Sequence, residues 1–353
     1  MLRETDSNAE YAPLPTHQSA PTDRVDTTPI PVIEAQGITR RFTVGEGLFG
    51  SGRTVHAVED VSLQVARGET LGLVGESGCG KSTLGRTLLR LIEPTSGTIR
   101  VEGRDITHLT AKELRPLRRR MQVIFQDPFS SLNPRMTIRQ TLTEPMRIHG
   151  LYRSRSDESH AISSLLDQVG LKRDALDRFP HEFSGGQRQR IGIARALAVK
   201  PSFIVCDEPL SALDVSIQAQ IINLLLDLQQ SHHVSYLFIS HDLEVVRFIS
   251  QRIAVMYLGR LVEVGPSEAV ATARLHPYTR ALLGATPVAE PGSGRKTRVL
   301  LEGDVPSPLA PPEGCAFHPR CSRAERGKCN REIPKLLPLG KKGHEVACFF
   351  PGD

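Results

Sequence analysis

The nine residues Gly75-Glu76-Ser77-Gly78-Cys79-Gly80-Lys81-Ser82-Thr83 fit G-x-x-x-x-G-K-[S/T], the pattern of a phosphate-binding loop. The preceding residues, Glu69–Val74, are typical of a short buried strand. The stretch that follows, Lys81–Ile92, predicts a helix with Leu84, Leu88, Leu91 and Ile92 on one face. Glycines between a strand and a helix let backbone N–H groups approach phosphate oxygens, and the helix N-terminus adds partial positive charge. Lys81 can reach the β- and γ-phosphates, and the Ser82 hydroxyl can ligate Mg²⁺.

Size and composition narrow the class of protein. The 353 residues leave room for two domains, and 24% charged with 39% hydrophobic residues is typical of a soluble globular chain. The sequence has no uninterrupted apolar run of about 18 residues, and its first thirty residues lack the apolar region of a secretion signal. We therefore expect a cytosolic chain that reaches a membrane only through a partner. A net charge of +5 is too modest to indicate a nucleic-acid partner, and the absence of Trp argues against base-stacking platforms for single strands.

The order of apolar and polar stretches predicts an α/β core with an insertion. Residues 1–30 are rich in Pro, Thr, Ser and acidic side chains, which predicts a disordered tail. Strands are expected at 32–42, 56–65, 98–103, 121–125, 203–206, 235–240 and 253–264, with a glycine-rich loop at 44–53. Residues 134–200 are mostly helical, with breaks expected at Pro145, Gly150, Gly170 and Pro180.

Polar side chains follow several of the apolar strands. Gln126, Asp207, Glu208 and His241 stand where α/β sheets place ligand-contacting groups. In a nucleotide hydrolase, Asp207 would hold Mg²⁺, Glu208 would take or orient the proton of the attacking water, and His241 would contact the γ-phosphate. The plainer alternatives are an acidic helix cap and a structural histidine. Phe42, at the end of the first strand, either stacks on an adenine ring or belongs to the core.

Taken together, six motifs resemble the ATP-binding subunit of an ABC transporter. They are the Walker A loop Gly75–Thr83, the Q-loop Gln126, the signature Ser184–Gln187, the Walker B strand Phe203–Glu208, the D-loop Ser211–Asp214 and the H-switch His241. The resemblance covers residues 32–285. The stretches 79–96 (CGKSTLGRTLLRLIEPTS), 125–134 (FQDPFSSLNP) and 181–196 (HEFSGGQRQRIGIARA) are similar to the oligopeptide/dipeptide importer branch, of the type often called OppF or DppF. So is the tail, in which HPYT at 276–279 precedes an extension with Pro and Cys.

The resemblance implies a fold and its boundaries. The fold is a P-loop NTPase of the ABC type, with a RecA-like core, an antiparallel β subdomain and a helical subdomain inserted at about 134–200. The ATP-binding domain would span 31–285, between the tail 1–30 and a small Cys-rich C-terminal extension, 286–353.

The resemblance also implies an ATPase in which two cassettes face each other head to tail. Phe42 and the loop residues Gly75 to Thr83 would bind this chain's own ATP. Mg²⁺ would be held through Ser82, Gln126 and Asp207, and the catalytic residues would be Glu208, His241 and Gln126. In contrast, Ser184, Gly185, Gly186, Gln187 and Asp214 would touch the nucleotide of the partner cassette.

The implied partners are a second ATPase subunit in a heterodimer, two integral membrane permease subunits and an extracytoplasmic substrate-binding protein. The chain would be peripheral, at the cytoplasmic face of the inner membrane, and would drive uptake of di- and oligopeptides. Nickel, glutathione or another small solute are alternative cargoes. A soluble ABC ATPase acting on ribosomes or DNA is a further alternative. However, the sequence has one phosphate loop, and residues 134–183 are too few for a long coiled coil.

Six cysteines fall into two groups. Cys79 and Cys206 are expected to be small core residues, although a thiol so near the phosphates predicts an ATPase that is sensitive to alkylation. Cys315, Cys321, Cys329 and Cys348 crowd the tail, where disulfides are not expected in a cytosolic chain. Three alternatives remain open for these four cysteines: a [4Fe–4S] cluster, a zinc ion or no metal, with His318 and His344 as spare ligands. Some members of the resembled branch carry a [4Fe–4S] cluster in this extension. Nothing in the sequence places this group near the nucleotide.

Overall fold

The computed structural model describes residues 29–45, 52–152, 154–284, 303–340 and 343–352. The expected disordered tail and the middle of the glycine-rich loop therefore lie outside the described residues. The strands are β1 Ile33–Val44, β2 Arg53–Val65, β3 Thr70–Val74, β4 Ser96–Val101, β5 Arg104–Asp105, β6 Met121–Ile124, β7 Phe203–Asp207, β8 Ser235–Ile239, β9 Arg252–Tyr257, β10 Arg260–Pro266, β11 Leu337–Pro338 and β12 Glu345–Val346. The α-helices are α1 Lys81–Leu88, α2 Ala111–Arg118, α3 Ile138–Ile148, α4 Arg155–Gln168, α5 Gly185–Leu197, α6 Val215–His232, α7 Leu243–Ile249, α8 Ser267–Ala273 and α9 Pro277–Gly284. Three 3₁₀ turns complete the set: η1 Arg173–Asp177, η2 Pro180–Glu182 and η3 His318–Arg320.

The larger sheet has the strand order β11-β12-β10-β9-β3-β8-β7-β6. The strands from β9 to β6 pair in parallel, whereas β10, β12 and β11 pair antiparallel. All five residues of each of β3, β7 and β8 are buried. Strands covered on both faces are expected to be continuously apolar, which is why these short runs can be recognised in the sequence.

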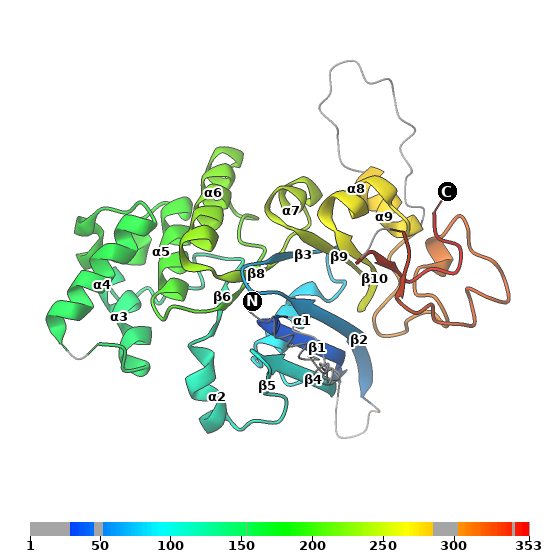
Figure 1. Cartoon of the computed structure of the whole chain (residues 1–353), viewed down its shortest axis with the longest axis horizontal. Coiled ribbons are helices and arrows are strands. Elements are labelled where there is room, and N and C mark those ends of the chain that lie inside the picture. The colour runs from blue at the N-terminus through cyan, green and yellow to red at the C-terminus, as the bar shows by residue number, and fades with distance from the viewer. Residues whose placement is uncertain (1–28, 46–51, 153, 285–302, 341–342, 353) are drawn as a thin grey trace, which may run out of the picture.

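The smaller sheet has the order β2-β1-β4-β5, and all its pairs are antiparallel. Helix α1 lies between the two sheets, because Leu84 and Leu88 pack in one core with Ile33 and Ile38 of the small sheet and Leu73 of the large one. The predicted α/β core with an antiparallel subdomain is therefore confirmed. Figure 1 shows helices α3 to α6 at one end of the molecule and the C-terminal extension at the other end, beyond α8 and α9.

In the described part of the chain between β6 and β7, helices are present and strands are absent, as predicted. Pro145 does not break a helix, however, because it lies inside α3. The capping box of Thr137 with Gln140 and the buried residues Leu142 and Met146 hold α3 together across the proline. None of the helices in the described residues is both long and apolar enough to cross a bilayer.

The first helix ends earlier than predicted, at Leu88 instead of Ile92. Arg90 takes a left-handed conformation with φ of 52°, and its buried guanidinium donates to the carbonyl oxygens of Ile106 and Leu109. Leu91 is consequently 47% exposed, so its expected place on the buried face is wrong.

The C-terminal extension is docked on the large sheet, which the sequence does not predict. Strand β12 pairs with β10, and β11 pairs with β12. Beneath this edge, the buried carboxylate of Glu263 accepts hydrogen bonds from the N–H groups of Leu275 and His276 and lies 2.8 Å from Nε2 of His344. His344 is thus a docking residue, and its expected role as a spare metal ligand is not supported.

We predict that Glu263→Ala lowers the free energy of unfolding by about 3–5 kcal/mol, because the N–H groups of Leu275 and His276 and the buried imidazole of His344 lose their partner. Urea denaturation of the full chain measures this change. The control is Glu268→Ala, which removes the exposed ion pair of Glu268 with Arg247 and should cost less than about 1 kcal/mol. Equal stability of the two variants would contradict this role of Glu263.

Candidate functional site

The phosphate loop connects β3 to α1 in a conformation that needs glycine. Gly80, the N-cap of α1, has φ of 106°, and a Cβ atom there would come within 2.1 Å of the carbonyl oxygen of Ala57. A side chain at this position would therefore both strain the backbone and collide with β2. Lys81 is buried, and its Nζ donates to the carbonyl oxygens of Gly75 and Glu76 at 2.8 and 3.0 Å.

A pocket of about 360 Å³ lies over this loop, a size that suits a small-molecule ligand. Its lining residues are Phe42, Val55, Ala57, Ser77, Gly78, Gly80, Lys81, Ser82, Thr83, Gln126, Glu208 and Pro308. Most of the predicted loop residues thus face the pocket, together with Phe42, Gln126 and Glu208. Pro308, which belongs to the C-terminal extension, carries no signal in the sequence that would have placed it here.

Phe42 is half-buried at the end of β1 and lines the pocket, so it is not a core residue. The guanidinium of Arg40 lies 4.3 Å from the centre of its ring. Stacking of Phe42 on an adenine ring remains a prediction.

Asp207, at the end of β7, is 1% exposed and accepts a hydrogen bond from the hydroxyl of Ser82 at 2.6 Å. Arg86 of α1 donates to the other carboxylate oxygen at 3.2 Å. These contacts join the Walker B strand to the phosphate loop. The structure therefore brings together two of the three residues predicted to hold Mg²⁺.

Glu208 has an unusual backbone, with φ of 46°, and its N–H donates to the carbonyl oxygen of Ile239. Non-glycine residues rarely occupy this region, and such strain gathers at functional sites. The carboxylate accepts from Nε2 of Gln126 at 3.0 Å and lies 3.6 Å from Nδ1 of His241. Two of the predicted catalytic residues, Gln126 and His241, are thus grouped around the carboxylate of the third, Glu208.

The predicted signature forms the start of α5. Ser184 is its exposed N-cap, and Ser184 and Gln187 form a reciprocal capping box. Gly186 lies against α6, because a Cβ atom there would meet Ile217 at 2.6 Å. Asp214, the exposed N-cap residue of α6, makes no side-chain capping bond. Within the described residues, the pocket over the phosphate loop is lined by neither the signature nor Asp214.

Three loop residues do not line the pocket: Gly75, Glu76 and Cys79. Glu76 pairs with Arg320 of the extension. Cys79 is buried, and burial raises the pKa of its thiol. Because alkylation needs an accessible thiolate, the expected sensitivity of the ATPase to alkylation at Cys79 is not supported.

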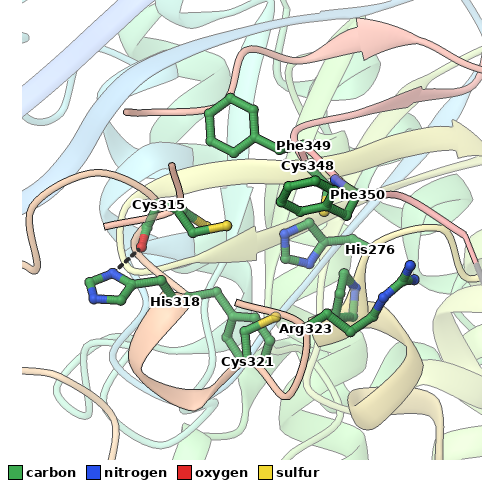
Figure 2. A pocket seen from close by; sticks show the side chains of 11 residues that line it. His276, Cys315, His318, Cys321, Arg323, Cys348, Phe349 and Phe350 are labelled. Atoms are coloured by element: carbon green, nitrogen blue, oxygen red, sulfur yellow. Dashed lines mark hydrogen bonds between the residues drawn. The ribbon is translucent and has the colours of Figure 1, made fainter. Parts of the chain in front are cut away.

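The four cysteines of the extension line a second cavity, together with His276, Phe317 and His318. Figure 2 shows Cys315, Cys321 and Cys348 around it, with His318 bonded to the carbonyl oxygen of Cys315. Burial, with a smaller contribution from the nearby cysteines, raises the pKa of Cys315 to about 11. Among the described residues, however, no three His, Cys, Asp or Glu side chains are grouped as they would be around a metal ion.

Comparisons with known proteins agree with this geometry. Residues 58–211 match the family described as ABC transporter, and residues 262–329 match the family described as oligopeptide/dipeptide transporter, C-terminal region. A protein of Sinorhizobium fredii named "Probable peptide ABC transporter ATP-binding protein y4tS" is 54% identical over 318 residues, which cover 90% of this chain and 89% of that protein. The oligopeptide transport ATP-binding protein AppF of Bacillus subtilis is 49% identical over 322 residues, which cover 90% and 97%.

Among solved structures, the dimeric ATP-binding cassette MJ0796 in a post-hydrolysis state with ADP and Pi is similar, with a TM-score of 0.59 and 28% identity. The similarity covers 67% of this chain and 98% of that cassette. With relatives matched over nine-tenths of its length and a complete cassette fold, this chain is a transporter ATPase and belongs to the ATP-binding subunits of ABC transporters of the oligopeptide/dipeptide type.

Proposed function

We propose that this chain hydrolyses ATP in a heterodimer of cassettes at the cytoplasmic face of the inner membrane, and so drives the uptake of di- and oligopeptides. Two permease subunits and an extracytoplasmic binding protein complete the transporter. The peptide transport proteins among its relatives support this cargo. Nickel, glutathione and other small solutes are alternative cargoes, and identifying the ligand of the binding protein decides between them.

The observation that carries the proposal is the grouping of Gln126, Glu208 and His241 beside the phosphate loop. With ATP in the pocket, Lys81 and the loop N–H groups bind the phosphates, and Glu208 accepts the proton of the attacking water or orients that water. His241 contacts the γ-phosphate. Gln126 senses the change of charge in the site when ATP is hydrolysed. It passes this change to the helical region that follows it in the chain.

A magnesium ion fits the oxygen atoms that gather at this site. The Ser82 hydroxyl, the Gln126 amide oxygen and the Asp207 carboxylate are hard oxygen ligands, and the short bond of Ser82 to Asp207 holds two of them side by side. When bound, the ion neutralises charge on the phosphates. Burial of Asp207 keeps its carboxylate fixed for that task.

The second half of the site comes from another subunit. Ser184 to Gln187 and Asp214 lie outside the pocket of their own chain, and the N-terminus of α5 is exposed. An exposed helix N-terminus with small residues attracts an anion, so the partner's γ-phosphate fits there when two cassettes meet head to tail.

The cysteine cavity is proposed to hold a [4Fe–4S] cluster through Cys315, Cys321, Cys329 and Cys348. Four thiols on one cavity are the donor set of such a cluster. Zinc and a metal-free cavity are the alternatives, since no three His, Cys, Asp or Glu side chains among the described residues are grouped as they would be around a metal ion. When bound, the cluster would staple together a segment of the chain that has few core residues.

We predict that Glu208→Gln lowers the ATPase rate of the assembled transporter by about 10²- to 10⁴-fold, while ATP binding is retained, because only the proton acceptor is lost. Steady-state ATPase assays and nucleotide retention measure the two effects. Glu268→Gln, at an exposed position of α8, is the control and should leave the rate unchanged. Near-normal turnover by Glu208→Gln would reject Glu208 as the catalytic carboxylate.

A second prediction concerns Ser184→Arg, which places a bulky side chain where the partner's nucleotide should bind. In a Lys81→Ala background, the remaining ATPase activity comes from the site that combines this chain's signature with the partner's phosphate loop. Adding Ser184→Arg should lower that remaining rate by about 100-fold. Ser154→Arg, at the exposed N-cap of α4, is the matched control for loss of a capping serine. A remaining rate that Ser184→Arg does not change would contradict the head-to-tail geometry.

Anaerobic purification of the full chain tests the cluster. We expect about four irons per chain and a broad visible absorption, both lost in Cys315→Ser. Cys206→Ser, in the core strand β7, should keep the iron. Colourless, iron-free wild-type protein would rule out the cluster without affecting the proposed ATPase.

A further inference from the structure

The C-terminal extension reaches the phosphate loop through Arg320. Its guanidinium donates to both carboxylate oxygens of Glu76, at 2.8 and 3.1 Å. The side chain of Arg320 is 6% exposed and that of Glu76 is 24% exposed. Two parallel charge-assisted hydrogen bonds fix both distance and orientation, and they are among the strongest polar contacts in proteins. The partners are 244 residues apart in the sequence.

The backbone of Glu76 is held from the same side. Its N–H donates to the hydroxyl of Tyr278 at 2.8 Å. The ring of Tyr278 packs on Tyr257 and on Phe317, with centroids 4.7 Å apart for the two tyrosines and 5.5 Å apart for Tyr278 and Phe317. Phe317 belongs to the extension and lines the cysteine cavity. The cavity and the phosphate loop are therefore joined by packed aromatic rings as well as by Arg320.

A third contact places the extension on the wall of the nucleotide pocket. Pro308 lines that pocket, and its carbonyl oxygen accepts a hydrogen bond from the N–H of His56 at 2.9 Å. His56 lies on β2, one residue from Val55, which lines the pocket too. The extension thus touches the nucleotide pocket directly and the phosphate loop from behind.

These contacts have an electrostatic consequence for a bound triphosphate. Glu76 is the second residue of the phosphate loop, so its carboxylate, if unpaired, would repel the phosphates. Arg320 supplies the compensating charge from a nearly buried position, where solvent screens it little. The same turn also positions Lys81, because the carbonyl oxygens of Gly75 and Glu76 accept from its Nζ.

We propose that the C-terminal extension is part of the ATP site, in which Arg320 is a positioning residue that neutralises Glu76 and fixes the first turn of the phosphate loop. Because Arg320 immediately precedes Cys321, a change in the cysteine cavity reaches MgATP through this pair. The inference rests on ATP binding at the loop and does not require a metal in the cavity.

The test is a double-mutant cycle on the full chain, with the dissociation constant for MgATP measured by equilibrium binding of a fluorescent ATP analogue. Arg320→Ala should raise this constant by about 5- to 150-fold, the range of typical coupling between sites. Glu76→Gln alone should raise it much less, because this change removes the repelling charge itself and leaves Arg320 in place. The double variant Arg320→Ala/Glu76→Gln should recover most of the affinity lost in Arg320→Ala.

The recovery separates positioning from a merely structural role, because removing a second contact cannot refold a loosened extension. In the assembled transporter, Arg320→Ala should raise KM for ATP and leave kcat nearly unchanged, and the double variant should recover most of the change in KM. Arg147→Ala is the matched control, since Arg147 makes an equally bidentate pair with Glu158 on the distant helices α3 and α4. It should bind MgATP as the wild type does.

Wild-type affinity in Arg320→Ala would overturn the proposal, and so would a double variant that binds no better than Arg320→Ala. Failure of the wild-type chain to bind MgATP is a different result, which would reject the proposed function itself.

Discussion

Parallel pairing of the buried strands β3, β8 and β7, with β6 at the edge of the sheet, is the constraint on which the rest of the structure depends. A strand that is covered on both faces can satisfy its N–H and C=O groups only through its two neighbours. The register pairs Ile124 with Cys206, so the residues two positions further on, Gln126 and Glu208, lie side by side. The register likewise pairs Asp207 with Ile239. Residues from distant parts of the chain therefore meet at one edge because the backbone requires it.

In the proposed function, this edge supplies one half of a hydrolytic site, and the signature supplies the other half on a different surface. Glu208 stands at the end of β7 in a strained left-handed conformation that its hydrogen bond to Ile239 helps to hold. The signature, by contrast, begins a helix whose exposed N-terminus carries its own capping box. A fold that builds both parts without joining them is suited to a site that is completed by association, and closure can then be coupled to movement elsewhere.

The sequence predicts those features of the fold that depend on residues close together in the chain. The phosphate loop, the buried runs and the polar residues after them were recognisable because a fully buried strand is short and apolar and its end is marked by a polar residue. The early end of α1 was not, because it depends on Arg90 finding carbonyl oxygens in the loop before α2. Pro145 was misjudged for a similar reason, since the packing of Leu142 and Met146 outweighs the missing N–H. Arg320 had no signal at all: a lone arginine among tail cysteines gains its meaning only from Glu76, which lies far away in the sequence.

The C-terminal extension is attached to the large sheet by contacts other than Arg320. Arg320 is therefore available to position the phosphate loop and is not needed to dock the extension. Docking is already provided by β12 on β10 and by the buried carboxylate of Glu263, which holds backbone N–H groups and His344. A nearly buried ion pair adds little net stability, since the desolvation of two charges offsets most of their attraction. Such a pair does fix the position of both side chains and balance their charges. Both effects matter at Glu76, because the carbonyl oxygens of Gly75 and Glu76 orient Lys81. The attachment of the extension to the sheet therefore does not depend on the contact of Arg320 with the phosphate loop, so under our proposal this contact can change while the extension stays docked.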